Sequence, residues 1–418
     1  MVIKQTSADK LWTGQYFLFM VVSLLFYLQH YTFFSLLPLY AMKVGGNNTV
    51  AGMMTGVFSL VSLLFRPLFG RMLDLKGRKP VVITGLAIIV VVTFSYNFCF
   101  NASSLIVIRI IHGAGFSAGT TAISTVVADI VPKKRLAEGI GYFGLSNTLA
   151  QALGPLIGLW IIQSSGFNQL FLLTAAISLV SLICALLVKY RKGNLGRENI
   201  EQKNKQQEQP LSSVAAVLSR LKNIRFMEPA LIAPAAVTLF ITTSNGAVQT
   251  FVAKYALARG IEDIGVFFTV FAIFTALSRV LAGKLSNRFG LGGVLVLAIV
   301  IMLLSQLTLV FAHQLFMFLI AAMCYGLALG FWQPTLNTIF VLFSSPERKG
   351  RAIAVFYSSV DIGIGVSAII LGRLSQAFGF PIIYVCTFCC CLITLAIYFL
   401  ALRSRLIATE QKLLGRTQ

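Results

Sequence analysis

The chain has 418 residues, of which 57% are hydrophobic and only 11% are charged, and its mean hydropathy is +0.85. Long apolar runs with so few charges exclude one water-soluble core. They favour a membrane protein whose helices satisfy their own backbone hydrogen bonds within lipid. The net charge of +21 would suit nucleic acid, but the basic residues stand in short segments between apolar runs, so we expect no nucleic-acid partner.

Twelve apolar segments are each long enough to cross a hydrocarbon layer of about 30 Å at about 1.5 Å per residue. In chain order the predicted spans are residues 16–41, 50–70, 80–99, 104–128, 138–162, 168–188, 228–253, 264–283, 291–312, 315–343, 352–373 and 380–402. The first run is too long for the apolar part of a signal peptide, and we expect it to be a retained span. The predicted fold class is an all-α integral membrane protein with 12 transmembrane helices.

One long polar stretch divides the chain between the sixth and seventh predicted spans. It predicts three parts, namely an N-terminal six-helix bundle (1–188), a cytoplasmic linker (189–227) and a C-terminal six-helix bundle with a short tail (228–418). Apolar residues at helical spacing near the end of the linker predict an amphipathic helix on the membrane surface, and they are Leu211, Val214, Leu218 and Leu221.

The distribution of basic residues predicts the orientation. With an even number of spans both termini lie on one side, and that side collects 27 Lys and Arg residues. The other side has only Lys43, Lys254, Arg259 and Arg373. By the positive-inside rule, we expect a multi-pass protein of the cell membrane with both termini and the linker in the cytoplasm.

An internal repeat relates the two halves. The segment "RPLFGRMLDLKG" (residues 66–77) aligns without gaps to "RVLAGKLSNRFG" (residues 279–290), 213 positions later. Gly113 and Gly326 keep the same offset. Two like-oriented halves predict bundles related by a pseudo-two-fold axis, with a substrate site between them near the middle of the membrane.

These segments resemble the major facilitator superfamily over essentially the whole chain, and the resemblance implies that family's fold. The turn between the second and third spans fits the family's loop pattern through Gly70, Asp74, Gly77, Arg78 and Lys79. In the fourth span "RIIHGAGFSAG" resembles a second family motif through Arg109, Gly113 and Gly115.

The fifth span resembles the family's antiporter motif. Its "ALGPLIG" matches through Gly154, Pro155 and Gly158, while Ala150 and Leu159 replace two glycines of that motif. The resemblance therefore points to the twelve-span drug:proton antiporter branch.

The resemblance implies a gate on the cytoplasmic side. Asp74 would sit against the N-terminus of the span that begins near Arg351, and Arg78 would reach Asp129. The glycines at 70 and 77 would permit close approach and a sharp turn. A solvated basic turn that serves topology alone is the alternative.

Pro155, after Gly154, would kink the fifth span against the eighth and seal the two halves against leakage, together with Gly158. An ordinary packing kink is the alternative. Arg66 and Arg279, at equivalent positions in the repeat, would snorkel or pair within their own half.

Ionisable groups inside the membrane are costly and usually functional. Asp361 lies about 15 Å into its span. It would carry the coupled proton or meet a cationic substrate, and a structural ion pair with a nearby base is the alternative. The resemblance implies that Arg109 influences proton transfer, whereas hydrogen bonding to carbonyl groups would be purely structural.

His112 lies on the same helix face as Arg109, either as a titrating group or as a satisfied buried histidine. Many drug:proton antiporters place a carboxylate in the first span. This chain has none there, and His30 would take its place. Other polar or aromatic residues that we expect to face the substrate are Tyr27, Tyr31, Asn245, Gln249, Trp332, Gln333, Asn337 and Tyr357.

Together these features predict a monomeric secondary transporter, without a cofactor, that exports a small amphiphilic or drug-like molecule in exchange for protons by alternating access. All seven cysteines lie in apolar runs, so we expect no metal site.

Export of a polar metabolite (a sugar or a metal-chelating product) and lipid flipping are alternatives. A receptor that does not transport, or a membrane enzyme, is the alternative from a different class of function. No catalytic spacing or phosphate-binding loop in the sequence supports an enzyme.

Overall fold

The computed structural model describes residues 11–132, 135–188, 228–344 and 349–413. The described chain is helical. The first part contains α1 (Gly14–Lys43), α2 (Asn48–Lys76), α3 (Arg78–Ser95), α4 (Ala102–Ile130), α5 (Leu136–Ser165) and α6 (Phe167–Leu187). The second part contains α9 (Ile232–Ala258), α10 (Gly265–Val310), α11 (Leu315–Leu342), α12 (Lys349–Phe378), α13 (Pro381–Ile397) and α14 (Arg403–Leu413).

Within the described residues, 11 helices are long and apolar enough to cross a membrane. The difference from the twelve predicted spans lies in α10. Its 46 residues include both of the spans predicted at 264–283 and 291–312, and helical geometry is broken only at Gly290 (φ 71, ψ 165). The predicted linker and its amphipathic helix lie outside the described residues.

Local sequence explains where the helices begin. The side chain of Asn47 accepts a hydrogen bond from the Val50 N–H (3.0 Å) at the start of α2, and Asn101 accepts one from Ser104 (2.8 Å) at the start of α4. Gly77 separates α2 from α3 with φ 83 and ψ 177, close to the values at Gly290. This left-handed region favours glycine, so the repeated "KG" and "FG" positions make the same sharp turn.

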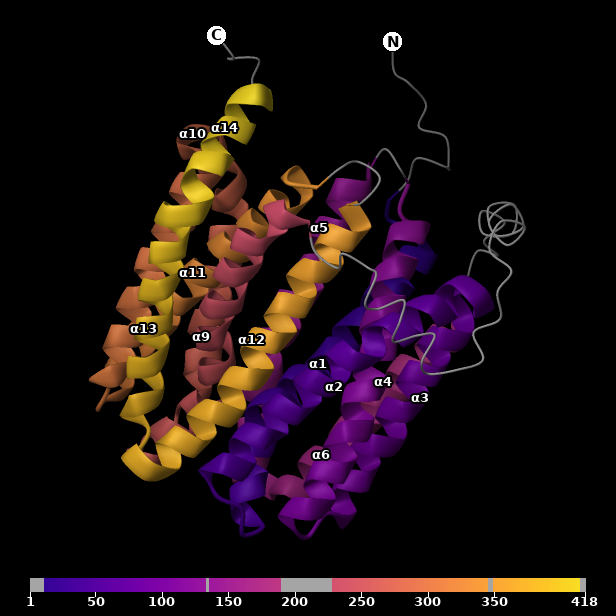
Figure 1. Ribbon diagram of the computed structural model, residues 1–418. Helices are drawn as coiled ribbons and strands as arrows, with labels where there is room; N and C mark the ends of the chain where they lie inside the picture. Colours follow the sequence, from indigo (N-terminus) through magenta and orange to yellow (C-terminus); the bar gives the residue numbers. More distant parts are fainter. Residues whose placement is uncertain (1–10, 133–134, 189–227, 345–348, 414–418) are drawn as a thin grey trace, which may run out of the picture.

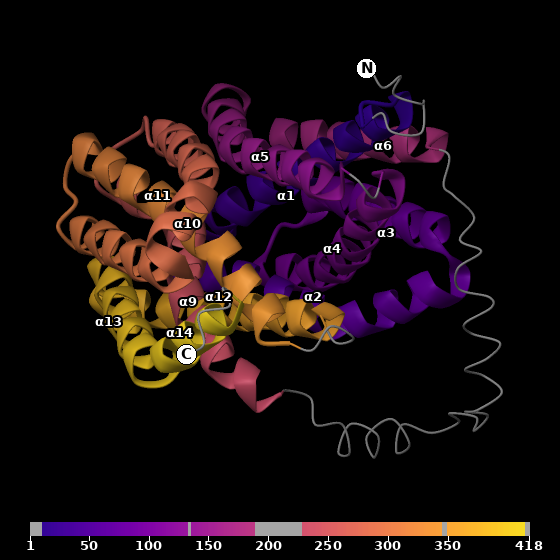
Figure 2. The ribbon, with the colours of Figure 1, turned by 90° about the horizontal axis from the view of Figure 1, so that it is seen from above.

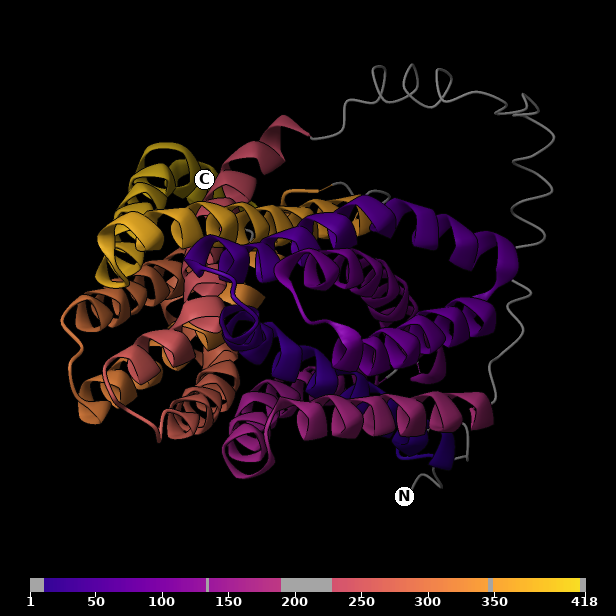
Figure 3. The ribbon, with the colours of Figure 1, turned by 90° about the horizontal axis from the view of Figure 1, so that it is seen from below.

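The helices form two groups (Figure 1). Helices α1–α6 lie together and α9–α14 lie together, and the view in Figure 2 shows the same division. Helix α1 begins and α14 ends at one end of the molecule, which we call the terminal end. The opposite end, where α2 begins and α12 ends, is called the far end. Helices α2 and α12 make the most extensive contact between the groups, followed by α5 with α10 and α1 with α9. Figure 3 shows the far end, with α12 in yellow-orange alongside α2 in indigo.

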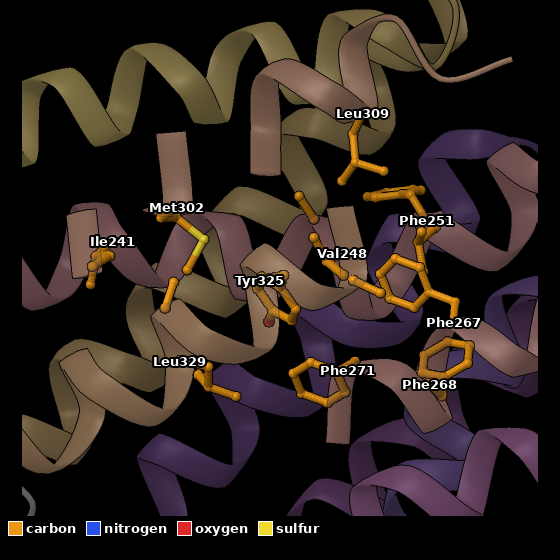
Figure 4. Packing of buried hydrophobic residues seen from close by; sticks show 14 of the residues in the cluster. Ile241, Val248, Phe251, Phe267, Phe268, Phe271, Met302, Leu309, Tyr325 and Leu329 are labelled. Atoms are coloured by element: carbon orange, nitrogen blue, oxygen red, sulfur yellow. The ribbon is translucent and has the colours of Figure 1, made fainter. Parts of the chain in front are cut away.

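Aromatic and aliphatic side chains fill the interior of the second group (Figure 4). Val248 and Phe251 of α9 face Phe271 of α10, whose ring stacks on Tyr325 of α11 at 5.0 Å between centroids. Each of these side chains is almost fully buried. Because lipid is as apolar as these residues, close packing holds such helices together more than exclusion from water does.

Candidate functional site

An ion pair joins the two helix groups at mid-depth. Arg66 of α2 reaches Asp361 of α12, with 2.8 Å between Nε and Oδ2. The Arg66 side chain is 26% exposed and the Asp361 side chain is 14% exposed, so neither is fully enclosed by protein. The guanidinium also lies 5.6 Å from the ring centroid of Tyr357, one turn earlier on α12. This is the ion pair with a nearby base that we gave as the alternative for Asp361, and the expectation that Arg66 pairs within its own half is wrong.

Arg279 makes the corresponding contact on the other side of the interface. From α10 it donates hydrogen bonds to the Gly144 carbonyl (3.0 Å) and to Thr148 Oγ1 (2.5 Å), both on α5. It also donates to Gln333 Oε1 (2.8 Å) on α11. Arg279 therefore bridges the two groups as well, and all three of these acceptors are neutral.

Tyrosines surround the two arginines. Tyr27 and Tyr31 of α1 lie one turn apart with their rings 6.4 Å apart. The Tyr31 hydroxyl donates to Asn147 Oδ1 of α5 (3.0 Å). Tyr357 is 38% exposed and lies within electrostatic range of Arg66 and Arg279. The structure thus brings Tyr27, Tyr31 and Tyr357, all predicted to face the substrate, to the arginine pair.

The other polar residues expected at the substrate site have more varied surroundings. Asn245 accepts a 2.6 Å hydrogen bond from Tyr325, and Gln249 accepts one of 3.4 Å from Ser35 of α1. Trp332 is 1% exposed and its Nε1 has no hydrogen-bond partner. Gln333 contacts Arg279, whereas Asn337 lies one turn further along α11 and is half-buried.

Arg109 lies in a separate buried cluster within the first group. Its Nε donates to the Met54 carbonyl (2.6 Å), and its guanidinium lies 4.1 Å from the ring centroid of Phe58. His112 Nδ1 lies 3.2 Å from Arg109 and 3.0 Å from the Tyr96 hydroxyl. Arg109 Nη2 and His112 Nε2 are buried without a hydrogen-bond partner. The expected face shared by Arg109 and His112 is therefore present.

His30 packs against the same cluster. Its ring stacks on Phe116 at 4.0 Å and on Phe58 at 5.2 Å, and only 6% of the residue is exposed. His30 Nδ1 has no hydrogen-bond partner. Phe58 contacts His30, Arg109 and His112, so these three predicted proton-coupling residues lie together, apart from Asp361.

Arg78, the first residue of α3, makes the predicted contact with Asp129 near the end of α4, with 2.9 Å between Arg78 Nε and Asp129 Oδ2. Gly77 makes the expected turn, but a side chain added at Gly70 would meet nothing within 4 Å. The close approach expected at Gly70 is therefore absent in this conformation. The side chain of Asp74, and its expected contact with the start of α12, lie outside the described residues.

Gly154 and Gly158 of α5 do not face the helix that we expected. A Cβ on Gly154 would lie 2.9 Å from the Leu28 carbonyl of α1, and one on Gly158 would meet Thr32 and Leu36 of the same helix. Pro155, between them, is buried within α5. Because the small residues lie on the α1 side, they permit close packing within the first group, and α5 meets α10 through other residues, among them Leu156.

Polar contacts at the far end join the groups a second time. Asn48, at the start of α2, accepts from Lys254 Nζ of α9 (2.5 Å), and its N–H donates to Gln376 Oε1 of α12 (3.0 Å). Thr250 of α9 donates to Thr55 of α2 (2.9 Å). In the described part of the chain, the polar links between the groups therefore lie at the far end and in the middle.

Sequence reasoning missed the partners of both arginines, together with Asn147, Thr148 and Lys254. The repeat carried part of the signal, because Asp361 and Thr148 are separated by the same 213 positions as Arg279 and Arg66. In the described part of the chain, no three His, Cys, Asp or Glu side chains gather as metal ligands would.

Comparison with known proteins identifies the class. A sequence model described as Major Facilitator Superfamily matches residues 19–262 and again residues 231–413. The chain belongs to this superfamily, and it is therefore a multi-pass membrane transporter and not an enzyme.

Two relatives show the range of similar proteins. The chain is 22% identical over 368 residues to the staphylopine export protein of Staphylococcus aureus, covering 87% of this chain and 90% of that one. It is 25% identical over 387 residues to the multidrug resistance protein MdtG of Salmonella arizonae, covering 90% and 92%.

Solved structures share the fold at low identity. A bacterial homologue of the human lysosomal transporter Spinster superposes with a TM-score of 0.70 at 18% identity, over 94% of this chain and 96% of that chain. The peptide transporter POT in complex with sulfate gives 0.72 at 14% identity, over 93% and 96%. At these identities the likeness concerns the fold alone.

Proposed function

We propose that this transporter exports a small amphiphilic or drug-like molecule in exchange for protons, by alternating access. In this proposal the chain crosses the membrane twelve times in two six-helix bundles, residues 1–188 and 228–418, joined by the linker 189–227. The 46 residues of α10 would span about 69 Å, more than two hydrocarbon thicknesses, so the turn at Gly290 would separate two crossings. The repeat of the Gly77 geometry at Gly290 supports this division.

The terminal end would face the cytoplasm, since the basic residues gather in the segments at that end. Among the residues that the structure describes, the polar links between the groups lie at the far end and at mid-depth, which suits a state closed to the outside and open toward the cytoplasm. In such a state substrate would enter from the cytoplasm and reach the tyrosines and arginines between the groups.

The ion pair between Arg66 and Asp361 carries the proposal. Protonation of Asp361 would remove its charge and with it the attraction to Arg66 across the α2–α12 contact. In the state open to the outside, where this contact is separated, Asp361 would take up a proton from the outside. On return to the state open to the cytoplasm the contact would reform, and the approach of the Arg66 charge would expel that proton to the cytoplasm, so the proton moves inward while the substrate moves outward.

The buried cluster of Arg109, His112 and His30 would serve proton movement within the first group. Its unpartnered nitrogens, His112 Nε2 and His30 Nδ1, are positions where a proton or a water molecule could be held. The Arg78–Asp129 pair, together with Asp74, would favour closure of the terminal end in the opposite state.

Export of a polar metabolite is the second candidate. Hydrogen-bonding groups lie near Arg279, among them Asn147 and Gln333, and would suit a hydrophilic solute. The staphylopine export protein is a relative of this chain by sequence. Competition between the two classes of compound in one transport assay would decide between them.

The test uses purified protein in liposomes with a pH-sensitive dye inside. Candidate compounds are added under an imposed pH gradient, and proton movement is recorded. Asp361→Asn is expected to abolish proton movement linked to the compound while leaving some exchange of compound between the two sides. Asp263→Asn is the matched control, because it removes an exposed carboxylate in the loop before α10. Proton-linked transport that persists in Asp361→Asn would refute the role of Asp361.

A further inference from the structure

The two central arginines occupy equivalent positions in the repeat but have different partners. Arg66 and Arg279 are 213 positions apart, and so are Thr148 and Asp361. Arg66 of α2 contacts Asp361, while Arg279 of α10 contacts Thr148. The repeat has therefore kept the contact between helices and changed its chemistry, from a charged acceptor to a neutral one.

No carboxylate contacts Arg279 among the residues that the structure describes. Its acceptors are the Gly144 carbonyl, Thr148 Oγ1 and Gln333 Oε1, and its Nε has no hydrogen-bond partner. Neutral acceptors orient a guanidinium but leave its charge uncompensated. A charge at mid-depth in a membrane is costly unless a counter-ion or water reaches it.

The charges around the substrate site are unequal. Within the described helices the mid-depth region between the groups has two guanidinium groups, those of Arg66 and Arg279, and one carboxylate, that of Asp361, while the guanidinium of Arg109 lies nearer the far end. Arg66 takes that carboxylate, and Arg109 is enclosed in its own cluster with Phe58 and His112. In the described helices, Arg279 remains as the mid-depth cation between the groups without an anionic partner, whereas Lys254, which also has a neutral acceptor, lies at the far end.

We infer that Arg279 binds an anionic group of the transported molecule, a carboxylate or an oxyanion of similar size. The inference rests on the proposed transport function, and it names the class of substrate as organic anions. The fork of a guanidinium matches two oxygens of a carboxylate. Tyr31 lies within electrostatic range of Arg279, and its hydroxyl bonds to Asn147 one residue before Thr148, so neutral hydrogen-bonding groups flank the anion site. The tyrosine rings would contact the apolar part of the same molecule.

The repeat also supplies the decisive variant. Thr148→Asp places a carboxylate next to Arg279 at the position equivalent to Asp361, so the protein provides its own counter-ion. If Arg279 is an anion site, this carboxylate occupies it and excludes the ligand. If Arg279 only braces α5 against α10, the same change strengthens the brace without affecting any ligand. Thr148→Asn is the matched control, because it has nearly the same shape as Asp and no charge.

The experiment measures binding in detergent, so it does not depend on transport. Three probes share one ring and differ in charge, namely phenylacetate, phenylacetamide and phenethylamine. Their binding to purified full-length protein is followed by the shift in thermal unfolding as each probe is titrated. We expect phenylacetate to stabilise the natural protein more than the amide or the amine does. Thr148→Asp and Arg279→Gln should each weaken phenylacetate binding about tenfold or more. Arg279→Gln removes the charged donor, and Thr148→Asp occupies that donor with a carboxylate of the protein itself.

Retention of a preference for phenylacetate in Thr148→Asn would show that charge at position 148, and not altered shape, removes binding. Equal shifts with the three probes, no shift with any of them, or unchanged phenylacetate binding in Thr148→Asp would each overturn the inference. Thermal unfolding without ligand confirms that every variant is folded. If anion binding fails while proton-linked transport in liposomes persists, the substrate class is wrong and the transport proposal stands.

Discussion

The α2–α12 contact and the α5–α10 contact are equivalent in the repeat, yet they differ at each depth. At mid-depth the first has an ion pair where the second has neutral hydrogen bonds. Nearer the far end the first brings Gly52 against Gly372, whereas the second brings Gly265 against leucines at 156 and 159. In the described residues, one contact is thus tight and contains a carboxylate, and the other contains neither feature. A duplicated chain can keep one architecture and confine the proton-sensitive part to one side.

The glycine contact tests this difference with the largest expected effect. A Cβ on Gly52 would meet the backbone of Ala368 and Gly372 on α12, which cannot move aside. A Cβ on Gly265 would lie 3.2 Å from a terminal methyl of Leu156, which can rotate away. Gly52→Val should therefore destabilise the closed far end by about 3 kcal/mol, near the upper end for overpacking, and Gly265→Val by about 1 kcal/mol or less.

Unfolding in detergent measures both values, and spin labels at the exposed Phe98 and Phe316 would report whether the far end opens. A longer label distance is expected in Gly52→Val only. Equal effects of the two substitutions would mean that the two contacts are equally tight, and the comparison would fail at this depth.

The sequence predicted the helices well because apolar length and short charged turns mark the spans directly. The spans predicted at 264–283 and 291–312 both lie within α10, on either side of the break at Gly290, so the count of twelve crossings stays a prediction. Sequence reasoning placed Gly154 and Gly158 of α5 against α10, whereas both face α1. The face that a glycine presents depends on helix rotation, which an apolar helix does not reveal when polar residues are few.

The central site was predicted in part. Asp361 and the tyrosines were found from their type and depth, because a polar group within an apolar span is conspicuous. Their partners were not found, since Arg66 and Asp361 are far apart in the chain and meet only after the two groups pack. The repeat offset would have paired Arg66 with Arg279 and Asp361 with Thr148, but only the structure shows that the pairing crosses between groups.

The mid-depth contacts are the second test. Asp361→Asn leaves the Arg66 guanidinium next to a neutral amide and should lower the free energy of unfolding by about 1–2 kcal/mol, less than for a fully buried pair because Arg66 is 26% exposed. Arg66→Gln combined with Asp361→Asn should recover part of this loss, since no charge is then left unpaired. Thr148→Ala removes one neutral acceptor of three and should cost about 0.5–1 kcal/mol.

A double-mutant cycle on Arg66 and Asp361 gives the coupling energy directly. The coupling should be present at neutral pH and should vanish in acid, where the carboxyl group is protonated. The Thr148→Ala cost should not change with pH over the same range. A pH-independent coupling between Arg66 and Asp361 would remove the reason for regarding α2–α12 as the proton-sensitive contact.

The smallest expected effect concerns two glutamines at the far end, which are also equivalent in the repeat. Gln376 of α12 accepts from the Asn48 N–H at the start of α2, and Gln163 of α5 donates to the Glu262 carbonyl before α10 (3.1 Å). Both glutamines are exposed, so water replaces each lost hydrogen bond and either substitution by Ala should cost about 0.5 kcal/mol.

The two substitutions should therefore cost similar free energies but have different effects on the population in which the far end is open. Gln376→Ala weakens the contact that has to separate when the far end opens, so it should raise the open population measured with the spin labels, whereas Gln163→Ala should leave that population unchanged. A shift of the same size in both variants would show that the two contacts open together, and the proton would then act on the whole interface and not on one side of it.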